Sequence, residues 1–277
     1  MRKVLYFTPI IAVLAVVAQQ SALFPVLKST VLLGKQPAGF YLVANNQLLR
    51  PWGELTTLRG RPVDMAYDSQ HRLLAVLDTR AILLLDPSTG AQLGEIATHP
   101  TSYAGIAFRP GDRELWASET ARNGPDAILI APLDELGRPG TPARIALKGH
   151  PLPVGIAFSR DGKTAYVAFS RNNTLAVIDA ATRTIREEIP TGLAPFAVAL
   201  AGDRVFVTNR GGRRPQAGES AAPSSGSMIL SDPVTGSSKS GSLTVLDTAT
   251  GKLRDVPTGL APAQIAVSPA GGLLAVT

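Results

Sequence analysis

The sequence predicts an all-β fold, and two observations carry that prediction. The 26 glycines and 22 prolines in 277 residues suit many short strands and tight turns better than long helices. Short apolar segments containing an alanine also recur along the chain: DMAY at 64–67, GIAF at 105–108, GIAF at 155–158, AVAL at 197–200 and QIAV at 264–267. Their alanines are 41, 50, 42 and 67 residues apart. Two of these spacings match the roughly 40–45-residue blade of a four-stranded β-propeller.

The same order of segments follows each alanine, as the third unit illustrates. A turn at 159–162 precedes the apolar segments 164–169 and 174–179, and the more polar segment 184–190 comes last. Continuous apolar segments are typical of strands buried on both faces, whereas a polar last strand suits an outer edge. A β-sandwich would not show a sequence repeat in a fixed order. We therefore predict a β-propeller of four-stranded blades, with the recurring alanines lining its central channel.

The number of units predicts an incomplete ring in this chain. There are four complete units, the first half of a fifth, and a hairpin-like piece at 46–58. Propellers have about four to eight blades and cannot end on a bare two-stranded edge. We expect six to eight blades in the complete propeller.

The first residues have the layout of a secretory signal peptide. Arg2 and Lys3 precede an apolar stretch from Val4 to Ala18, and another small residue follows at Ala22. About 15 apolar residues fall short of the roughly 20 that a membrane-spanning helix needs. We predict a signal peptide at 1–22, a linker at 23–45 and the propeller at 46–277, with a loop insertion at 211–240. The protein is then exported to the periplasm or beyond the cell, and meets a membrane only through the leader.

Composition excludes several kinds of chemistry. The chain has no cysteine, which excludes disulfides, thiolate metal sites and a cysteine nucleophile. Its net charge of +6, or +4 without Arg2 and Lys3, is scattered rather than massed, so no nucleic-acid footprint is predicted. GxSxG, HExxH and Walker motifs are absent from the sequence. We predict no cofactor, and we favour a non-catalytic role for the region present.

One strand matches the signature of a known family. Phe206-Val207-Thr208-Asn209 resembles the tetrapeptide of the YVTN-repeat β-propellers, as do 174–185 and 190–200 around it. The match is looser at 166–169 and at 75–78. The resemblance covers residues from about 40 to 277. It implies the propeller fold and says little about activity, because propellers host many unrelated functions.

A narrower resemblance concerns two further segments. Residues 45–67 and 209–247 look like a bacterial subset in which a secreted YVTN propeller precedes a phosphoesterase of the alkaline-phosphatase superfamily. This resemblance implies a metal-dependent catalytic domain beyond Thr277, and none of its metal-ligand motifs occurs in residues 1–277. Sequencing past Thr277 separates this alternative from a free-standing propeller.

The loops at one end of the predicted blades are the candidate binding site. Loops from a second to a third strand, and from one blade to the next, share one face of a propeller, which we call the loop face. Such loops on a rigid scaffold often carry function. The candidate ligand-binding residues there are His99, Glu119, His150, Arg171, Asn172, Asn209 and Arg210.

These residues admit more than one interpretation. A protein or a small polar or anionic ligand is the partner that they suggest. The competing interpretation is that Glu119 and Asn209 satisfy backbone groups, and that the two His-Pro pairs are turn residues. A metal site is disfavoured because the histidines lack a shared local spacing. The insertion at 211–240 is either a docking element or a surface excursion without a role.

Three functions therefore remain open. The leading hypothesis is a non-catalytic scaffold that binds a ligand or partner, and the alternative is the phosphoesterase fusion. A third hypothesis, a lactonase-like propeller enzyme, requires acids and histidines that converge on one face.

Overall fold

The computed structural model describes residues 33–277, except residues 38, 46, 51, 54, 122 and 269. Every regular element in that part is a β-strand. It contains no helix of the length and apolarity needed to cross a membrane. The chain divides into two compact units, one up to Thr57 and the other from Leu58 to Thr277. The predicted signal peptide at 1–22 lies outside the described residues.

The first unit contains a small antiparallel sheet. Its three strands are Gly34–Lys35 (β1), Tyr41–Leu42 (β2) and Leu48–Leu49 (β3), paired in chain order. The first two lie in the segment predicted to be a linker.

The second unit contains four antiparallel four-stranded sheets, the blades, and two two-stranded sheets. The first blade contains Pro62–Asp68 (β4), Leu73–Asp78 (β5), Ala81–Leu85 (β6) and Gln92–Ala97 (β7). The second contains Thr101–Phe108 (β8), Glu114–Glu119 (β9), Ala127–Pro132 (β10) and Ala143–Ala146 (β11). The third contains Pro153–Phe158 (β12), Thr164–Phe169 (β13), Thr174–Asp179 (β14) and Thr184–Pro190 (β15). The fourth contains Leu193–Ala201 (β16), Arg204–Gly212 (β17), Ser242–Asp247 (β20) and Leu253–Pro257 (β21). Ile265–Val267 (β22) and Leu274–Val276 (β23) form one of the two-stranded sheets, and the other lies in the insertion at 211–240.

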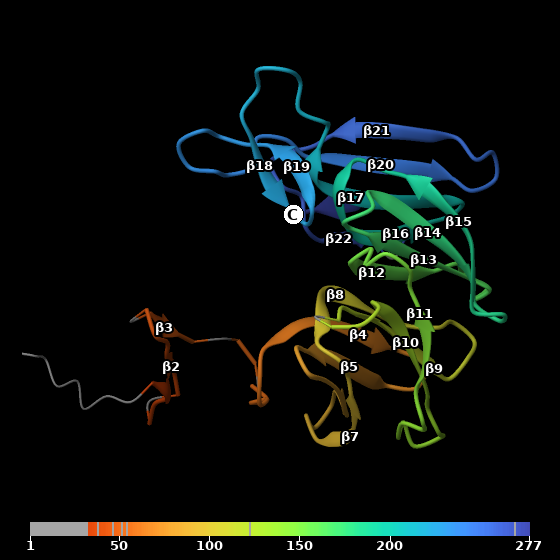
Figure 1. The fold of residues 1–277 in the computed structure, drawn as a ribbon. Coiled ribbons are helices and arrows are strands. Elements are labelled where there is room, and N and C mark those ends of the chain that lie inside the picture. Colours follow the sequence, from red (N-terminus) through yellow and green to blue (C-terminus); the bar gives the residue numbers. More distant parts are fainter. Residues whose placement is uncertain are drawn as a thin grey trace, which may run out of the picture. The chain divides into compact units, whose positions relative to one another are not determined.

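The blades follow one another as in a β-propeller (Figure 1). The innermost strands β4, β8, β12, β16 and β22 lie side by side in chain order. Separate apolar clusters fill the spaces between the first and second, second and third, and third and fourth blades. The predicted repeat is therefore a repeat of blades around a common axis.

The recurring alanine pairs with the following strand in all five repeats. In the first four, the recurring alanine pairs with the third residue of the following strand: Ala66 with Ala75, Ala107 with Trp116, Ala157 with Tyr166, and Ala199 with Phe206. In the fifth, Ala266 pairs with Ala275, the middle residue of β23. The predicted orientation of these alanines is wrong, however. Ala66, Ala107 and Ala157 pack against the clusters between their own blade and the next, not into a channel. An innermost strand, like any strand, points its side chains to the two faces of its sheet, and those faces meet neighbouring blades.

The second and third strands of a blade are buried on both faces. In β9, Leu115 and Ala117 contact the cluster toward the first blade, and Trp116 faces the third. Trp116 meets Phe158 of the third blade edge-to-face, with ring centroids 5.2 Å apart. This two-sided burial explains the continuous apolar segments in the sequence.

Glycine allows the innermost strands to approach one another closely. A Cβ added to Gly155 would lie 2.6 Å from the Phe196 carbonyl oxygen and 2.8 Å from Ala197 Cα on the next blade. Gly105 stands at the same place in the preceding repeat, where a Cβ would overlap the Val154 carbonyl. Non-bonded carbon atoms prefer separations of about 3.5–4.0 Å, so no larger residue fits this approach.

Polar side chains link successive blades where their innermost strands approach one another. Ser118 donates its hydroxyl to the Val154 carbonyl at 2.7 Å, and Thr208 donates to the Ala263 carbonyl at 2.9 Å. Asp64 joins the first blade to the second by accepting the Gly105 N–H at 2.8 Å. Ser118 and Thr208 occupy the same position of the repeat, which is the Thr of the YVTN-like tetrapeptide.

The close approach predicts a steric cost at Gly155. The substitution Gly155→Ala should lower the free energy of unfolding by about 1–3 kcal/mol, because the neighbouring backbone must move to accept the methyl group. Gly259→Ala is the matched control, since a Cβ there meets nothing within 4 Å. Urea unfolding measures both variants. Equal stability of the two would contradict the assigned strand approach.

Candidate functional site

The structure places the seven predicted residues at the loop face. His99 lies between β7 and β8, His150 between β11 and β12, and Arg171 and Asn172 between β13 and β14. Glu119 ends β9, and Asn209 and Arg210 lie in β17. They belong to three blades, and their surroundings differ sharply.

Glu119 has a buried carboxylate that is fully engaged. Its side chain is 2% exposed and accepts hydrogen bonds from Arg144 Nε at 2.7 Å and Nη2 at 3.0 Å. The backbone N–H of His99 donates to the same carboxylate at 3.1 Å. The hydrogen bond to Glu119 raises the pKa of Arg144. Glu119 therefore links β9 to the outer strand β11, on the far side of β10, and to the 98–100 segment.

Asn209 has an equivalent role within the fourth blade. Its buried Nδ2 donates to Ser242 Oγ at 3.0 Å and to Thr244 Oγ1 at 2.8 Å. A Cβ on neighbouring Gly192 would lie 2.7 Å from the Asn209 amide, so the amide is enclosed. Asn209 therefore ties β17 to β20 from a buried position.

The two histidines belong to separate connections between blades, and both are exposed. The His150 imidazole lies 3.6 Å from buried Asp126, which accepts the backbone N–H groups of Ala121 and Leu152. No cluster of three or more His, Asp or Glu side chains suited to a metal ion occurs among the described residues.

Exposed side chains make up the rest of the predicted site. Asn172 donates a long hydrogen bond of 3.4 Å to Glu188. Arg171 donates to the His150 carbonyl at 2.6 Å. The guanidinium of Arg210 lies over the Phe196 ring, 5.1 Å from its centroid. These contacts hold both arginines while leaving them accessible at the surface.

The insertion at 211–240 forms an ordered hairpin on this face. Its strands Ala221–Ser224 (β18) and Ser227–Leu230 (β19) are antiparallel. Ile229 is 7% exposed and packs over Gly211, where an added Cβ would overlap it. Ser227 exchanges hydrogen bonds with Asn173 of the third blade, at 2.8 and 3.1 Å. The hairpin is thus attached to both the third and fourth blades.

Sequence reasoning missed two of these features. Asn173 has φ +58°, a conformation that Asn tolerates better than most residues, and the residue type gave a weak hint of it. The second missed feature is a turn within the insertion, and its signal in the sequence was clearer. Asp232-Pro-Val-Thr-Gly236 repeats the turn that follows the third strand of a blade, as at 86–90 and 247–251. The same two backbone hydrogen bonds close all three turns.

A groove with a volume of about 380 Å³ lies where the two ends of the insertion join the fourth blade. Its lining residues include both charge signs: Arg213, Lys239, Ser240, Gly241, Ser242, Asp255, Pro257 and Thr258.

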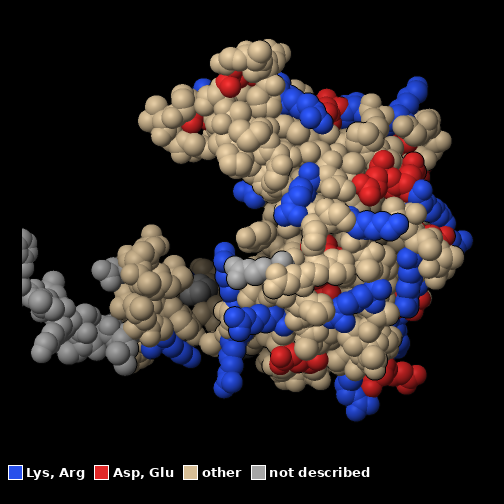
Figure 2. Space-filling view, viewed as in Figure 1, with Lys and Arg blue, Asp and Glu red and all other residues tan. Residues whose placement is uncertain are grey.

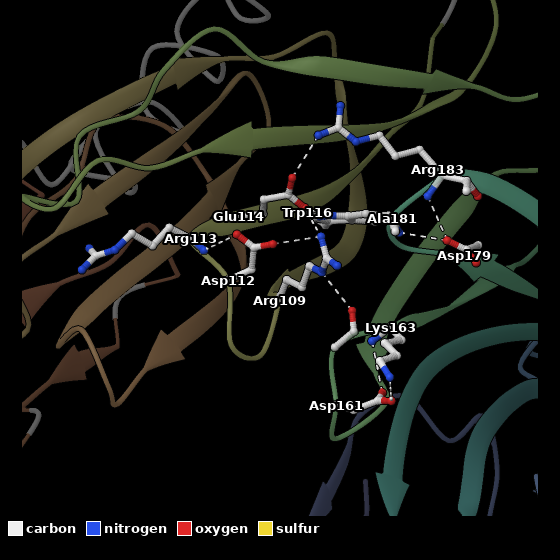
Figure 3. Close-up of polar contacts among 12 residues, drawn as sticks. Arg109, Asp112, Arg113, Glu114, Trp116, Asp161, Lys163, Asp179, Ala181 and Arg183 are labelled. Carbon is white, nitrogen blue, oxygen red and sulfur yellow. Dashed lines mark hydrogen bonds and ion pairs between the residues drawn. The ribbon is translucent and has the colours of Figure 1, made fainter.

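The opposite end of the blades, which we call the turn face, holds a network of ion pairs (Figure 3). Glu114 accepts hydrogen bonds from Arg109 at 3.1 Å, Trp116 Nε1 at 3.1 Å and Arg183 at 2.9 Å. Arg183 belongs to the third blade, and Arg109 also donates to the Gly162 carbonyl there at 2.9 Å. Burial would raise the pKa of Glu114, but the hydrogen bonds from Trp116, Arg109 and Arg183 outweigh it, so the pKa is lowered. The network joins the second and third blades.

Charged side chains are spread over the face of the blades seen in Figure 2. Figure 2 shows Lys and Arg side chains distributed across the visible face of the blades, with Asp and Glu in smaller groups between them.

No family model and no curated protein sequence matches the chain. Solved structures match its fold. Hydrazine synthase of Kuenenia stuttgartiensis matches with a TM-score of 0.58 at 18% identity, over 81% of this chain and 58% of that chain. A chain of a mitotic checkpoint complex matches with a TM-score of 0.55 at 14% identity, over 85% of this chain and 63% of that one. The Cps50 (Swd1) β-propeller domain of Myceliophteria thermophila is 15% identical, with a TM-score of 0.44 over 84% of this chain and 87% of that domain.

At sequence identities of 18% and 14%, these matches are evidence about the fold alone. The chain spans less than two thirds of the hydrazine synthase and checkpoint-complex chains that it matches. Blade topology and these matches agree, and the chain is a β-propeller of four-stranded antiparallel blades.

The lowered pKa of Glu114 predicts a pH-dependent stability. A carboxylate whose pKa is lower in the folded than in the unfolded chain stabilises the fold above the unfolded pKa, about 4.3 for Glu. That contribution is lost as the pH falls through the folded pKa. Glu114→Gln should cost about 1–2 kcal/mol near pH 7, and the difference from the parent protein should shrink below about pH 4. Chemical denaturation between pH 7 and 3 measures it; a constant difference would refute this role for Glu114.

Proposed function

We propose that this chain is a non-catalytic β-propeller scaffold whose loop face binds a protein partner. The ordered insertion hairpin is the observation that carries the proposal. It is fixed to two blades by Ile229 and by the Asn173–Ser227 hydrogen bonds, yet it leaves Met228 54% and Val234 90% exposed. Exposed apolar residues on a fixed support suit a protein interface. One matched structure is a chain of a mitotic checkpoint complex, which supports a scaffold role.

The contacts of Glu119, the acidic residue of the predicted site, also favour binding over catalysis. A lactonase-like site would need carboxylates and imidazoles that converge. Glu119 instead bonds to the guanidinium of Arg144 and to the backbone N–H of His99. Its role in fixing β11 accounts for its burial without a reaction.

We also propose that the protein is exported, on the leader-like sequence at 1–22. N-terminal sequencing of the purified protein tests this proposal; a retained Met1 would count against a cleaved leader. Membership of the YVTN-repeat family, and the phosphoesterase fusion as its alternative form, rest on the sequence resemblances alone. A reading frame that ends soon after residue 277 would eliminate the fusion.

The proposed interface predicts position-dependent crosslinking. A photoreactive residue replacing Met228 in the full chain, expressed in its native host, should crosslink to a discrete partner because the side chain faces outward from the hairpin. The same residue replacing Leu136, which is 67% exposed on the turn face, is the control. Mass spectrometry compares the products. Identical products from both positions, or none from position 228, would contradict a loop-face interface.

A further inference from the structure

Arginines with and without acidic partners occur on both faces of the blades: Arg213 pairs with Glu219 on the loop face, and no ion pair with a described carboxylate is formed by Arg160 or Arg204 on the turn face. On the turn face, Arg109, Arg183 and Arg186 each form an ion pair with a carboxylate. On the loop face, Arg171, Arg210 and Arg214 are exposed, and none of them forms an ion pair with a described carboxylate. The loop face therefore presents guanidinium groups that are available to an external acid.

Two carboxylates of the insertion already have partners within the protein. Glu219 of the insertion accepts hydrogen bonds from both terminal nitrogens of Arg213, at 2.7 and 2.6 Å. These hydrogen bonds from Arg213 lower the pKa of Glu219 to about 2. Asp232 accepts the backbone N–H groups of Val234 and Thr235. Both remain ionised and engaged, so they compete weakly for the free arginines.

Two of the three arginines are held before any partner arrives. Arg171 is fixed by its bond to the His150 carbonyl, and its side chain packs against Gly226 at the turn of the hairpin. Arg210 is fixed over Phe196, and its carbonyl accepts the Ser238 hydroxyl at the base of the insertion. Side chains already held in one conformation lose less entropy on binding. Arginine also presents a planar fork that matches a carboxylate.

We infer that the loop face binds an acidic segment of a partner protein, whose carboxylates pair with Arg171, Arg210 and Arg214 around the insertion. The inference rests on the proposed function, because it names the chemistry of that interface. Exposed Met228 and Val234 of the same insertion favour a peptide of acidic and apolar residues over a nucleic acid. A nucleic acid would also be expected to meet a denser array of cations.

Two charge-matched variants of the full chain test the inference. The first carries Arg171→Gln, Arg210→Gln and Arg214→Gln on the loop face. The second carries Arg160→Gln, Arg204→Gln and Lys252→Gln, three exposed residues at the turn end of the blades. Both lose three positive charges, so any difference reports position rather than net charge. Thermal unfolding shows whether each variant folds like the parent protein.

The probe is a fluorescein-labelled 16-residue peptide of alternating Glu and Leu, followed by fluorescence anisotropy. The parent protein should bind it more tightly than the matching Gln–Leu peptide. The loop-face variant should bind the Glu–Leu peptide about tenfold more weakly, whereas the turn-face variant stays within about twofold. Added salt should weaken binding by the parent protein. Equal weakening by both variants, equal affinity for the two peptides, or tighter binding of a 16-nucleotide single strand would overturn the inference.

Crosslinking from position 228 separates this inference from the proposed function. Equal capture of a partner by the parent protein and the loop-face variant would support the loop-face interface. It would contradict the pairing of the three arginines with an acidic segment. Loss of the crosslink in the loop-face variant, but not in the turn-face variant, supports both the loop-face interface and its binding of an acidic segment.

Discussion

The close approach of innermost strands in consecutive blades is the constraint on which the rest of the fold depends. At Gly105 and Gly155 the carbonyl of the next blade occupies the space that a Cβ would fill. This approach brings the sheet faces together, so the second and third strands of each blade are buried on both sides and must be apolar. The blades are consequently held side by side, and the loops that join them are presented on one face.

The YVTN-like tetrapeptide acquires a physical meaning from this arrangement. Its third position reaches the next blade through a hydroxyl, as at Ser118 and Thr208. Its fourth position stays within its own blade, where Glu119 pairs with Arg144 and Asn209 bonds to β20. Different residue types thus serve one structural purpose at each position. A consequence for function is that the polar groups nearest the loop face are largely engaged, and exposed arginines and the insertion hairpin remain for contacts with a partner.

The sequence predicted the blades because burial on two faces leaves a pattern that is visible in the chain. It did not predict the orientation of the recurring alanines, because spacing does not show which side of a strand faces a neighbour. Nor did it predict the partner of Glu119, because Arg144 is 25 residues away and no local pattern links the two. The sequence pattern indicated Arg171 and Arg210 as loop residues, but their contacts with the His150 carbonyl and the Phe196 ring depend on tertiary structure, which no local pattern reveals.

The third blade offers the most direct test of the link between blades. Ala168 occupies the position of Ser118 and Thr208, and the Phe196 carbonyl stands where the Val154 and Ala263 carbonyls stand in the other blades. We expect Ala168→Ser to raise the free energy of unfolding by about 0.5–1 kcal/mol through a new hydrogen bond to that carbonyl. Ala176→Ser, at another fully buried alanine, should be destabilising and is the control. If Ala168→Ser lowers stability as much as the control does, the proposed link between blades is contradicted.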